Sequence, residues 1–236
     1  MKITVINGSP RADRSGTLNI TKAFLTGIRD VVPDCTAEEF NLSKMNIKPC
    51  RGCFCCWSKT PGECVIHDDV RTVMTAVLSS DIVIESFPLY FFGMPSILKQ
   101  LTDRMLPLTL AYGYEISPVS AKSFHEFRYK ELCEKKLVLI TSCGYTQTDK
   151  MYGALLSQFD LICGEGNYTC IMCPQGELLH VEQMKPRLDR YFGIVREAGM
   201  AFARDGRLDV ELLEKLKAPL LSPKGFEMLA RSHWVK

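Results

Sequence analysis

Five short apolar runs, each followed by a loop and a helix-like segment, recur along this chain of 236 residues. Such runs are typical of buried strands, and the amphipathic segments between them are typical of crossover helices. Because strands that alternate with helices form a parallel sheet covered on both faces, the pattern predicts a doubly wound α/β fold. The expected strands are 2–7, 35–42, 81–86, 136–141 and 167–172.

The alternation covers residues 1–205, which we expect to form one domain. With 46% hydrophobic and 24% charged residues, the chain has the composition of a globular protein with a sizeable core. Residues 108–135 interrupt the rhythm and are interpreted as an insertion, either a lid over the site or an oligomer contact. Residues 206–236 form a polar tail with one expected short helix, docked on the domain or on a partner subunit.

The charge balance and the cysteine content limit the classes of partner. A net charge of +2 gives no electrostatic case for nucleic acid or for an anionic membrane. No apolar run approaches the length that crosses a bilayer, and the strand expected over residues 2–6 leaves no room for a signal peptide. Eleven cysteines in such a chain favour a reducing compartment, so we expect a cytoplasmic protein.

A polar segment, GSPRADRSGTLN, connects the first expected strand to a helix expected over residues 20–28. A loop that leads into a helix N-terminus binds anions, because its amides and the helix dipole point at the ligand. Hydroxyl groups can donate to phosphate oxygens, and an arginine can add a charge-assisted bond. The plain alternative is a polar turn in which Thr17 caps the helix. The candidate phosphate-binding residues are Ser9, Arg11, Ser15, Gly16, Thr17 and Leu18.

Two further loops follow the third and fourth expected strands. Five strands favour the flavodoxin-like order 2-1-3-4-5, in which these loops and the first one meet at the carboxyl edge of the sheet. An aromatic loop, which suits a flat ligand or simple burial, and an amide-rich loop beside a phosphate loop are the parts that FMN needs. The candidate residues are Pro88, Leu89, Tyr90, Phe91, Phe92, Gly93 and Met94, and Ser142, Cys143, Gly144 and Tyr145.

Five of the eleven cysteines fall between residues 50 and 64. Four of them, Cys50, Cys53, Cys56 and Cys64, follow the pattern C-x2-C-x2-C-x7-C within a loop over residues 49–66. Four clustered thiolates are the ligands of iron–sulfur clusters, and structural zinc also takes four. Zinc sites usually present two separated pairs, so the spacing favours a cluster. Zinc and ordinary buried cysteines remain open alternatives.

Several other polar residues have simpler interpretations. Asp68 and Asp69 are expected to cap the next helix, and Lys99, Asp103 and Arg104 are expected to form ion pairs on the helix after the aromatic loop. The pair formed by Cys170 and Cys173 is expected to reflect core packing or a chance spacing rather than a site. Cys143 has no assignable histidine partner, so a cysteine nucleophile is disfavoured.

The segments GSPR…SGTLN, PLYFFGMPSILKQLTDR and CRGCFCCW…GECVIHDD resemble flavodoxin-fold NAD(P)H-dependent FMN reductases. More narrowly, the cysteine pattern resembles that of the iron–sulfur flavoproteins of anaerobic bacteria and archaea. The resemblance covers about residues 1–205, and it implies FMN at the loops named above. It also implies a [4Fe–4S] cluster on Cys50, Cys53, Cys56 and Cys64, in a homodimer or homotetramer. Cys55 is an additional thiol inside the motif.

We therefore expect an FMN-dependent oxidoreductase that passes electrons between FMN and a [4Fe–4S] cluster, with the flavin rather than a side chain carrying the chemistry. The expected partners are a redox protein, or NAD(P)H and a small electron acceptor. One alternative is an NAD(P)H-dependent FMN or quinone reductase without a cluster. A second alternative is a non-catalytic electron carrier of flavodoxin type.

Overall fold

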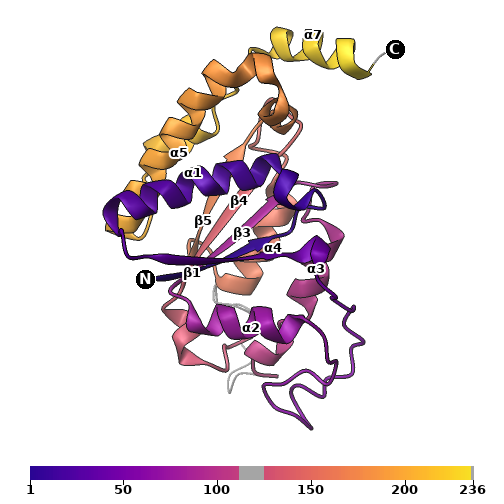
Figure 1. The fold of residues 1–236 in the computed structure, drawn as a ribbon. Coiled ribbons are helices and arrows are strands. Elements are labelled where there is room, and N and C mark those ends of the chain that lie inside the picture. Colours follow the sequence, from indigo (N-terminus) through magenta and orange to yellow (C-terminus); the bar gives the residue numbers. More distant parts are fainter. Residues whose placement is uncertain (112–124, 235–236) are drawn as a thin grey trace.

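The computed structural model describes residues 1–111 and 125–234, and its centre is a five-stranded parallel sheet (Figure 1). The strands stand in the order β2-β1-β3-β4-β5, which confirms the predicted flavodoxin-like architecture. β1, β3 and β4 are the buried central strands, and the charged β2 lies at an edge, as strand burial and charge predict. The strands are β1 (Lys2–Asn7), β2 (Thr36–Asn41), β3 (Ile82–Pro88), β4 (Lys136–Ser142) and β5 (Tyr168–Cys173).

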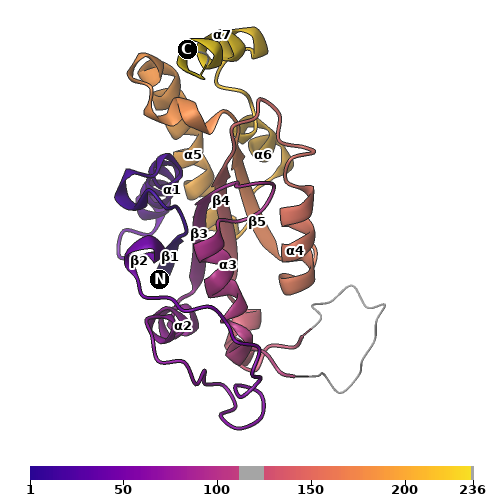
Figure 2. The same cartoon turned by 90° about the vertical axis from the view of Figure 1, so that its right-hand side faces the viewer.

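Helices cover both faces of the sheet (Figures 1 and 2). One apolar core lies between the sheet and α1, α5 and α6, and a second lies between the sheet and α2, α3 and α4. None of these helices, within the described part of the chain, is long and apolar enough to cross a membrane. The helices are α1 (Gly16–Val31), α2 (Val70–Ser79), α3 (Ser96–Asp103), α4 (Gly153–Cys163), α5 (Lys185–Asp205), α6 (Val210–Leu216) and α7 (Pro223–Trp234).

α1 begins one turn earlier than the apolar periodicity indicates, at Gly16 instead of Ile20. Its N-cap is Ser15, whose Oγ accepts a hydrogen bond from the backbone N–H of Leu18 at 3.3 Å. The interpretation of Thr17 as the cap is therefore wrong. The first turn is built from small polar residues, which carry no apolar period but fit a capped helix start.

α1 and α5 cross at two glycines, Gly27 and Gly199. A Cβ atom added to Gly199 would lie 2.1 Å from the carbonyl oxygen of Phe24, and one added to Gly27 would lie 2.0 Å from that of Arg196. Real Cβ atoms do not approach a backbone oxygen so closely. The two helices pack backbone to backbone only because both positions lack a side chain.

The C-terminal residues contain two helices, α6 and α7, where the sequence predicted one. Leu216 and Leu220 are buried in the same core as α1 and α5. The side-chain amide of Gln175, in the turn after β5, donates to Leu221 O at 3.0 Å and accepts from Leu221 N at 2.8 Å. Residues 208–221 are therefore packed on the sheet domain, and α7 extends from its end (Figure 1).

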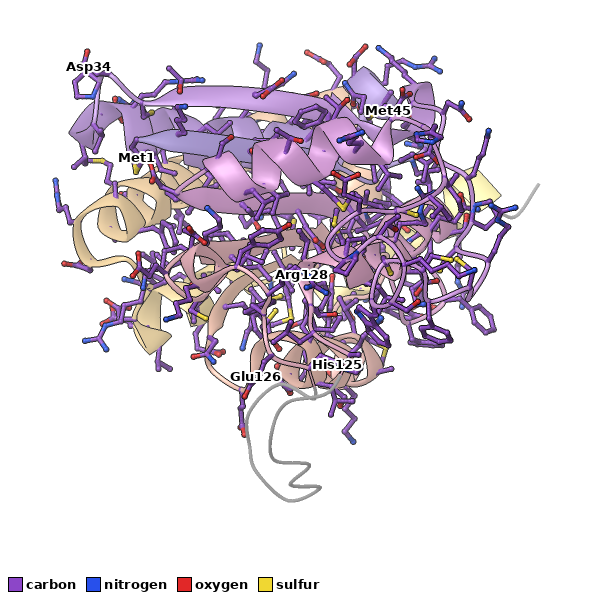
Figure 3. The ribbon with its side chains drawn as sticks, turned by 90° about the horizontal axis from the view of Figure 1, so that it is seen from below. Met1, Asp34, Met45, His125, Glu126 and Arg128 are labelled. Carbon is purple, nitrogen blue, oxygen red and sulfur yellow. The ribbon has the colours of Figure 1, made fainter. Side chains whose placement is uncertain are left out.

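Of the expected insertion, residues 112–124 lie outside the described part of the chain. The two flanks pair with each other: the N–H of Leu110 donates to Glu126 O and that of Arg128 donates to Leu108 O, both at 2.8 Å. His125, Glu126 and Arg128 lie together on the side of the molecule beneath the sheet (Figure 3).

Candidate functional site

Three loops meet at the carboxyl edge of the central strands. The N–H of Gly8 donates to Ser86 O at 2.9 Å and that of Leu89 to Ser142 O at 2.7 Å, which ties the turn after β1 to β3 and the turn after β3 to β4. Thr17 Oγ1 and Ser142 Oγ lie 2.7 Å apart. The structure thus brings together the three segments that the sequence singled out.

The turn after β1 provides a hydroxyl-lined helix start. Ser9, Ser15 and Thr17 are buried at this start, and Arg11 is exposed beside it. The N–H groups of Gly16 and Thr17 belong to the first turn of α1 and have no intrahelical acceptor. Together with the positive end of the helix dipole, these donors fit a phosphate monoester such as that of FMN. Leu18 is buried in the core, so only its backbone faces this turn.

The aromatic loop is a tight hairpin. Tyr90 N donates to Gly93 O at 2.9 Å and Gly93 N donates to Tyr90 O at 3.0 Å, so Phe91 and Phe92 form its two-residue tip. Both have positive φ, +47° and +66°, a conformation that aromatic residues rarely adopt. Phe91 is 99% exposed, and Phe92 stacks on Tyr145 with ring centroids 5.9 Å apart.

A strained turn that exposes aromatic rings is typical of a binding surface rather than of a core. Two other residues of the loop have buried side chains. Leu89 and Met94 are buried in the core under α3, and Thr102 donates to the sulfur of Met94 at 3.4 Å. Their backbones border the site, while their side chains serve packing.

Cys143 does not have the environment of a nucleophile. Its side chain is buried in the core on the α2 and α4 face of the sheet, and burial raises the pKa of its thiol. Burial likewise raises the pKa values of Cys170 and Cys173 to about 12. These three cysteines are neutral thiols, which agrees with core packing.

Sequence reasoning missed the turn after β5 (residues 174–180). Gln175 N donates to Tyr145 O at 2.9 Å and Gly176 N donates to Cys143 O at 2.7 Å, which joins this turn to the amide-rich loop. Glu177 lies against Gly144, and His180 lies against Gly16. Burial, with Arg11 nearby, lowers the pKa of His180. The turn contains a positive φ of +54° at Gln175, and no motif in the sequence predicts this turn.

The cysteine loop follows β2 and lies beside α2 and the end of α3 (Figure 1). Its four motif cysteines line one small cavity of about 20 Å³ and Cys55 does not line it. Arg104, Leu106 and Pro107 also line it. The Trp57 indole anchors the loop body, because its Nε1–H donates to Leu106 O at 3.0 Å.

The thiols of the loop influence one another electrostatically. Hydrogen bonds from the backbone and thiol of Cys55 lower the pKa of Cys53, and the same thiol contact raises the pKa of Cys55. Burial, followed by the charges of Cys64, Cys53 and Cys50, raises the pKa of Cys56. A thiol whose pKa rises because other thiolates lie near it is a group that a bound cation would deprotonate.

Within residues 1–111 and 125–234, no three His, Cys, Asp or Glu side chains stand close enough to share one metal ion. Four thiols around one cavity are the donor set of a structural zinc site, where every sulfur lies about 2.3 Å from one ion, and equally of an iron–sulfur cluster. A [4Fe–4S] cluster places one thiolate on each of four irons, so its ligands are more widely spaced. The donor set of four thiols therefore suits a cluster as well as a single ion.

The predicted roles of two charged residues, Arg104 and Asp69, need correction. Arg104 does not pair on its own helix: it follows α3 and forms a buried ion pair with Asp68, with 2.8 Å between Nη1 and Oδ2. Lys99 and Asp103 do form the expected i, i+4 pair. Asp69 makes no side-chain cap to α2 but accepts from Asn46 N at 2.7 Å. Asp68 accepts from Val70 N at 3.2 Å, so part of the predicted cap is present.

The ion pair also affects ionisation. Burial raises the pKa of Asp68, but hydrogen bonds from Arg104 and the Lys48 amide outweigh it and hold the pKa below its usual range. Burial alone would lower the pKa of Arg104. The hydrogen bond to Asp68 and the nearby Cys64 thiol have the larger effect, so the pKa of Arg104 is raised. Both groups are therefore charged in the folded protein.

Known proteins are similar to this chain at the level of sequence. The chain is 34% identical over 112 residues to an iron–sulfur flavoprotein of Methanocaldococcus jannaschii, an alignment that covers 48% of this chain and 55% of that protein. It is 29% identical over 147 residues to an iron–sulfur flavoprotein of Clostridioides difficile, covering 61% and 64%. The chain thus spans roughly half to two thirds of the length of these curated relatives.

Solved structures show the same fold at lower identity. An NAD(P)H:quinone oxidoreductase from Methanothermobacter marburgensis superposes with a TM-score of 0.59 at 17% identity, covering 87% of this chain and 95% of that one. An FMN-dependent NADH-azoreductase from Bacillus anthracis, in complex with FMN, gives 0.57 at 17% identity, covering 86% and 100%.

Residues 1–163 match the family whose description is a flavodoxin-like fold. The match covers most of the chain and contains the first four strands of the sheet, together with the turn after β1 and the aromatic, amide-rich and cysteine loops. The strand order agrees independently. This chain belongs to the family of proteins with the flavodoxin-like fold.

Proposed function

We propose that this protein is an FMN-dependent oxidoreductase of the iron–sulfur flavoprotein type. FMN would lie at the carboxyl edge, held by the α1 start and the aromatic and amide-rich loops. Cys50, Cys53, Cys56 and Cys64 would hold a [4Fe–4S] cluster. The observation that carries the proposal is that these four cysteines, and not Cys55, line one small cavity, on a loop that leaves the same edge of the sheet.

The chemistry divides between the groups and the chain. When bound, FMN supplies hydride chemistry and a cluster supplies single-electron transfer. The chain's own residues bind and orient: Ser9, Ser15 and Thr17 donate toward the phosphate, and Tyr145 and Phe92 offer stacked rings beside the ligand edge. The proposed partners are a redox protein, or NAD(P)H and a small electron acceptor.

Assembly and compartment belong to the same proposal. A hairpin tip with Phe91 fully exposed suits a contact with a second subunit, as in a homodimer or homotetramer.

All eleven cysteines lie among the described residues and all are free thiols. Free thiols in this number suit a reducing compartment such as the cytoplasm.

Two observations favour a second candidate, an NAD(P)H-dependent FMN or quinone reductase without a cluster. The described side chains contain no group that could hold a single metal ion, and the fold neighbours include reductases of this kind. The two candidates differ in iron content. Anaerobic purification followed by iron, zinc and flavin quantification separates them: about four irons and one flavin per chain support the proposal, and flavin alone supports the second candidate.

A matched pair of cysteine variants tests the ligand set. Cys53→Ser removes a thiol that lines the cavity, and we expect it to lower the iron content while FMN stays bound. Cys55→Ser removes the neighbouring thiol that does not line it, and we expect iron to stay at the wild-type level. Iron lost in Cys55→Ser and kept in Cys53→Ser would reverse the assignment.

A further inference from the structure

A single side chain holds both ends of the cysteine loop. Arg104 is 1% exposed, and its Nη1 donates to Lys48 O at 2.7 Å and to Asp68 at 2.8 Å. Its Nη2 donates to Ile66 O at 3.2 Å and to Asp68 at 3.0 Å. Asp68 in turn accepts from Lys48 N at 2.9 Å. One guanidinium and one carboxylate therefore join the chain before the loop to the chain after it.

The positions of these bonds along the sequence are informative. Lys48 lies two residues before Cys50, and Ile66 lies two residues after Cys64. All four motif cysteines are enclosed between the two carbonyls that Arg104 binds. Joining the two ends of the loop, at residues 48 and 66, restricts the conformations of the thiols. This lowers the conformational entropy that the loop loses when the thiols bind a shared ligand.

One donor of Arg104 is left over. Its Nε is buried and makes no hydrogen bond of ordinary geometry among the described residues, while both Nη atoms are fully engaged. The Cys64 thiol is the sulfur in side-chain contact with the guanidinium. Buried donors without a partner are rare and destabilising. Arg104 lines the cysteine cavity together with Cys64, so the unused N–H lies on a guanidinium that borders sulfur. A thiolate or a cluster sulfur there would supply the missing acceptor.

We propose that Arg104 is the positioning residue of the cysteine site: it closes the loop through its two Nη atoms and donates Nε–H to sulfur in the cavity. The loop-closing part stands on the hydrogen bonds alone, and the donation to a cluster rests on the proposed function. A charged donor to sulfur stabilises the reduced, more negative state of a cluster, so Arg104 would raise its reduction potential.

Two variants and one control test this. Arg104→Lys keeps a positive charge beside Asp68 but cannot reproduce the planar array of five donors. Arg104→Met with Asp68→Leu replaces the ion pair by apolar groups, an exchange that buried pairs often tolerate. Arg71→Gln removes an exposed arginine that pairs with Glu63 of the same loop, and it serves as the matched control.

The first readout uses protein without iron and reports on loop opening. Cys56 is 8% exposed inside the loop, and Cys173 is fully buried in the sheet core. Alkylation by iodoacetamide, followed residue by residue with mass spectrometry, compares local with global opening. In both Arg104 variants we expect Cys56 to react about tenfold faster or more, because several charged hydrogen bonds are lost, with Cys173 unchanged. Arg71→Gln should match the wild type.

The second readout uses anaerobically reconstituted protein and measures iron per flavin and the cluster potential. We expect Arg104→Lys to retain less iron and to show a more negative potential than the wild type. Wild-type rates, iron content and potential in both variants would overturn the inference. Parallel acceleration at Cys56 and Cys173 would also overturn it, since that result describes a purely structural ion pair. Wild-type protein that takes up no iron, with Cys56 still accelerated, would leave the loop closure standing and refute the proposed cluster.

Discussion

Thr17 Oγ1 lies 2.7 Å from Ser142 Oγ, and both side chains are buried. The contact links the first turn of α1 to the carboxyl end of β4, two elements far apart in the sequence. Each hydroxyl carries one proton and two acceptor sites, so one proton of the pair is used in the contact and the other stays available. The pair therefore connects the turn after β1 to the amide-rich loop while leaving a donor for a ligand.

Thr17→Val tests this connection, because it removes the hydroxyl group at nearly constant volume. Losing one hydrogen bond to a charged phosphate should raise the Kd for FMN about tenfold. Fluorescence titration of flavin-free protein measures the change. Thr26→Val is the control, since Thr26 is exposed on the same helix and donates only to Lys22 O. An unchanged Kd in Thr17→Val would remove Thr17 from the proposed phosphate site.

The hairpin tip, Phe91 and Phe92, allows a test of whether its backbone strain is retained because the tip has a function. Phe91→Asn with Phe92→Gly places the residues that a two-residue hairpin with positive φ prefers. Relief of two strained positions should stabilise the protein by about 1 to 2 kcal/mol. The same change removes the exposed rings, so we expect weaker flavin binding or a smaller assembly, measured by titration and by light scattering.

Denaturant unfolding of the flavin-free protein provides the stability measurement for this double variant. Greater stability with weaker binding or assembly is the expected combination. A variant that is no more stable, and that binds and assembles like the wild type, would show that the tip is neither strained nor functional.

Much of the fold was predictable because its signals are local. The strands β1, β3 and β4 are apolar runs bounded by turn residues, and their ends match the predicted ones to within two residues. Helix starts were less accurate, since Ser15 and Gly16 carry no apolar period. The tail was predicted with one helix because the apolar residues of α7 are few and interrupted by charges.

The candidate site was predictable to the extent that each loop carries its own composition. Hydroxyl, aromatic and cysteine-rich stretches are visible in the sequence, and the strand order brings the loops together. Contacts between residues that are far apart in the sequence could not be predicted in this way. Nothing near Arg104 in the sequence indicates a bond to Lys48 O or Ile66 O, and nothing near Glu177 indicates its approach to Gly144.

The crossing of α1 and α5 predicts a large effect from a small substitution. Gly199→Ala places a methyl group 2.1 Å from the carbonyl oxygen of Phe24, so the helices must separate. We expect a loss of about 2 to 4 kcal/mol in the free energy of unfolding, in the range of overpacked or disrupted cores.

Gly193→Ala is a matched control on the same helix, because an added Cβ there meets nothing within 4 Å. Alanine is the better helix former, so this variant should be more stable by up to about 1 kcal/mol. Urea unfolding of both variants measures the difference. Equal stabilities would show that the two helices do not pack backbone to backbone.

Glu85 predicts how stability depends on pH. It lies on the central strand β3, its Oε2 is buried without a partner among the described residues, and burial raises its pKa from 4.5 to about 7. The folded state therefore binds a proton that the unfolded state releases between pH 4.5 and 7. Across this window the free energy of unfolding must fall as the pH rises, because the unfolded state binds fewer protons.

The difference between wild type and Glu85→Gln isolates this contribution, since other groups titrate alike in both. We expect the wild type to lose about 2 to 3 kcal/mol relative to Glu85→Gln between pH 4.5 and 7.5, with no further change above that range. Urea unfolding at several pH values measures it, with Glu38→Gln on the exposed face of β2 as the control. A difference that stays constant with pH would mean that Glu85 is hydrated or paired in the folded protein. A difference that grows in favour of the wild type would mean that its carboxylate is stabilised there.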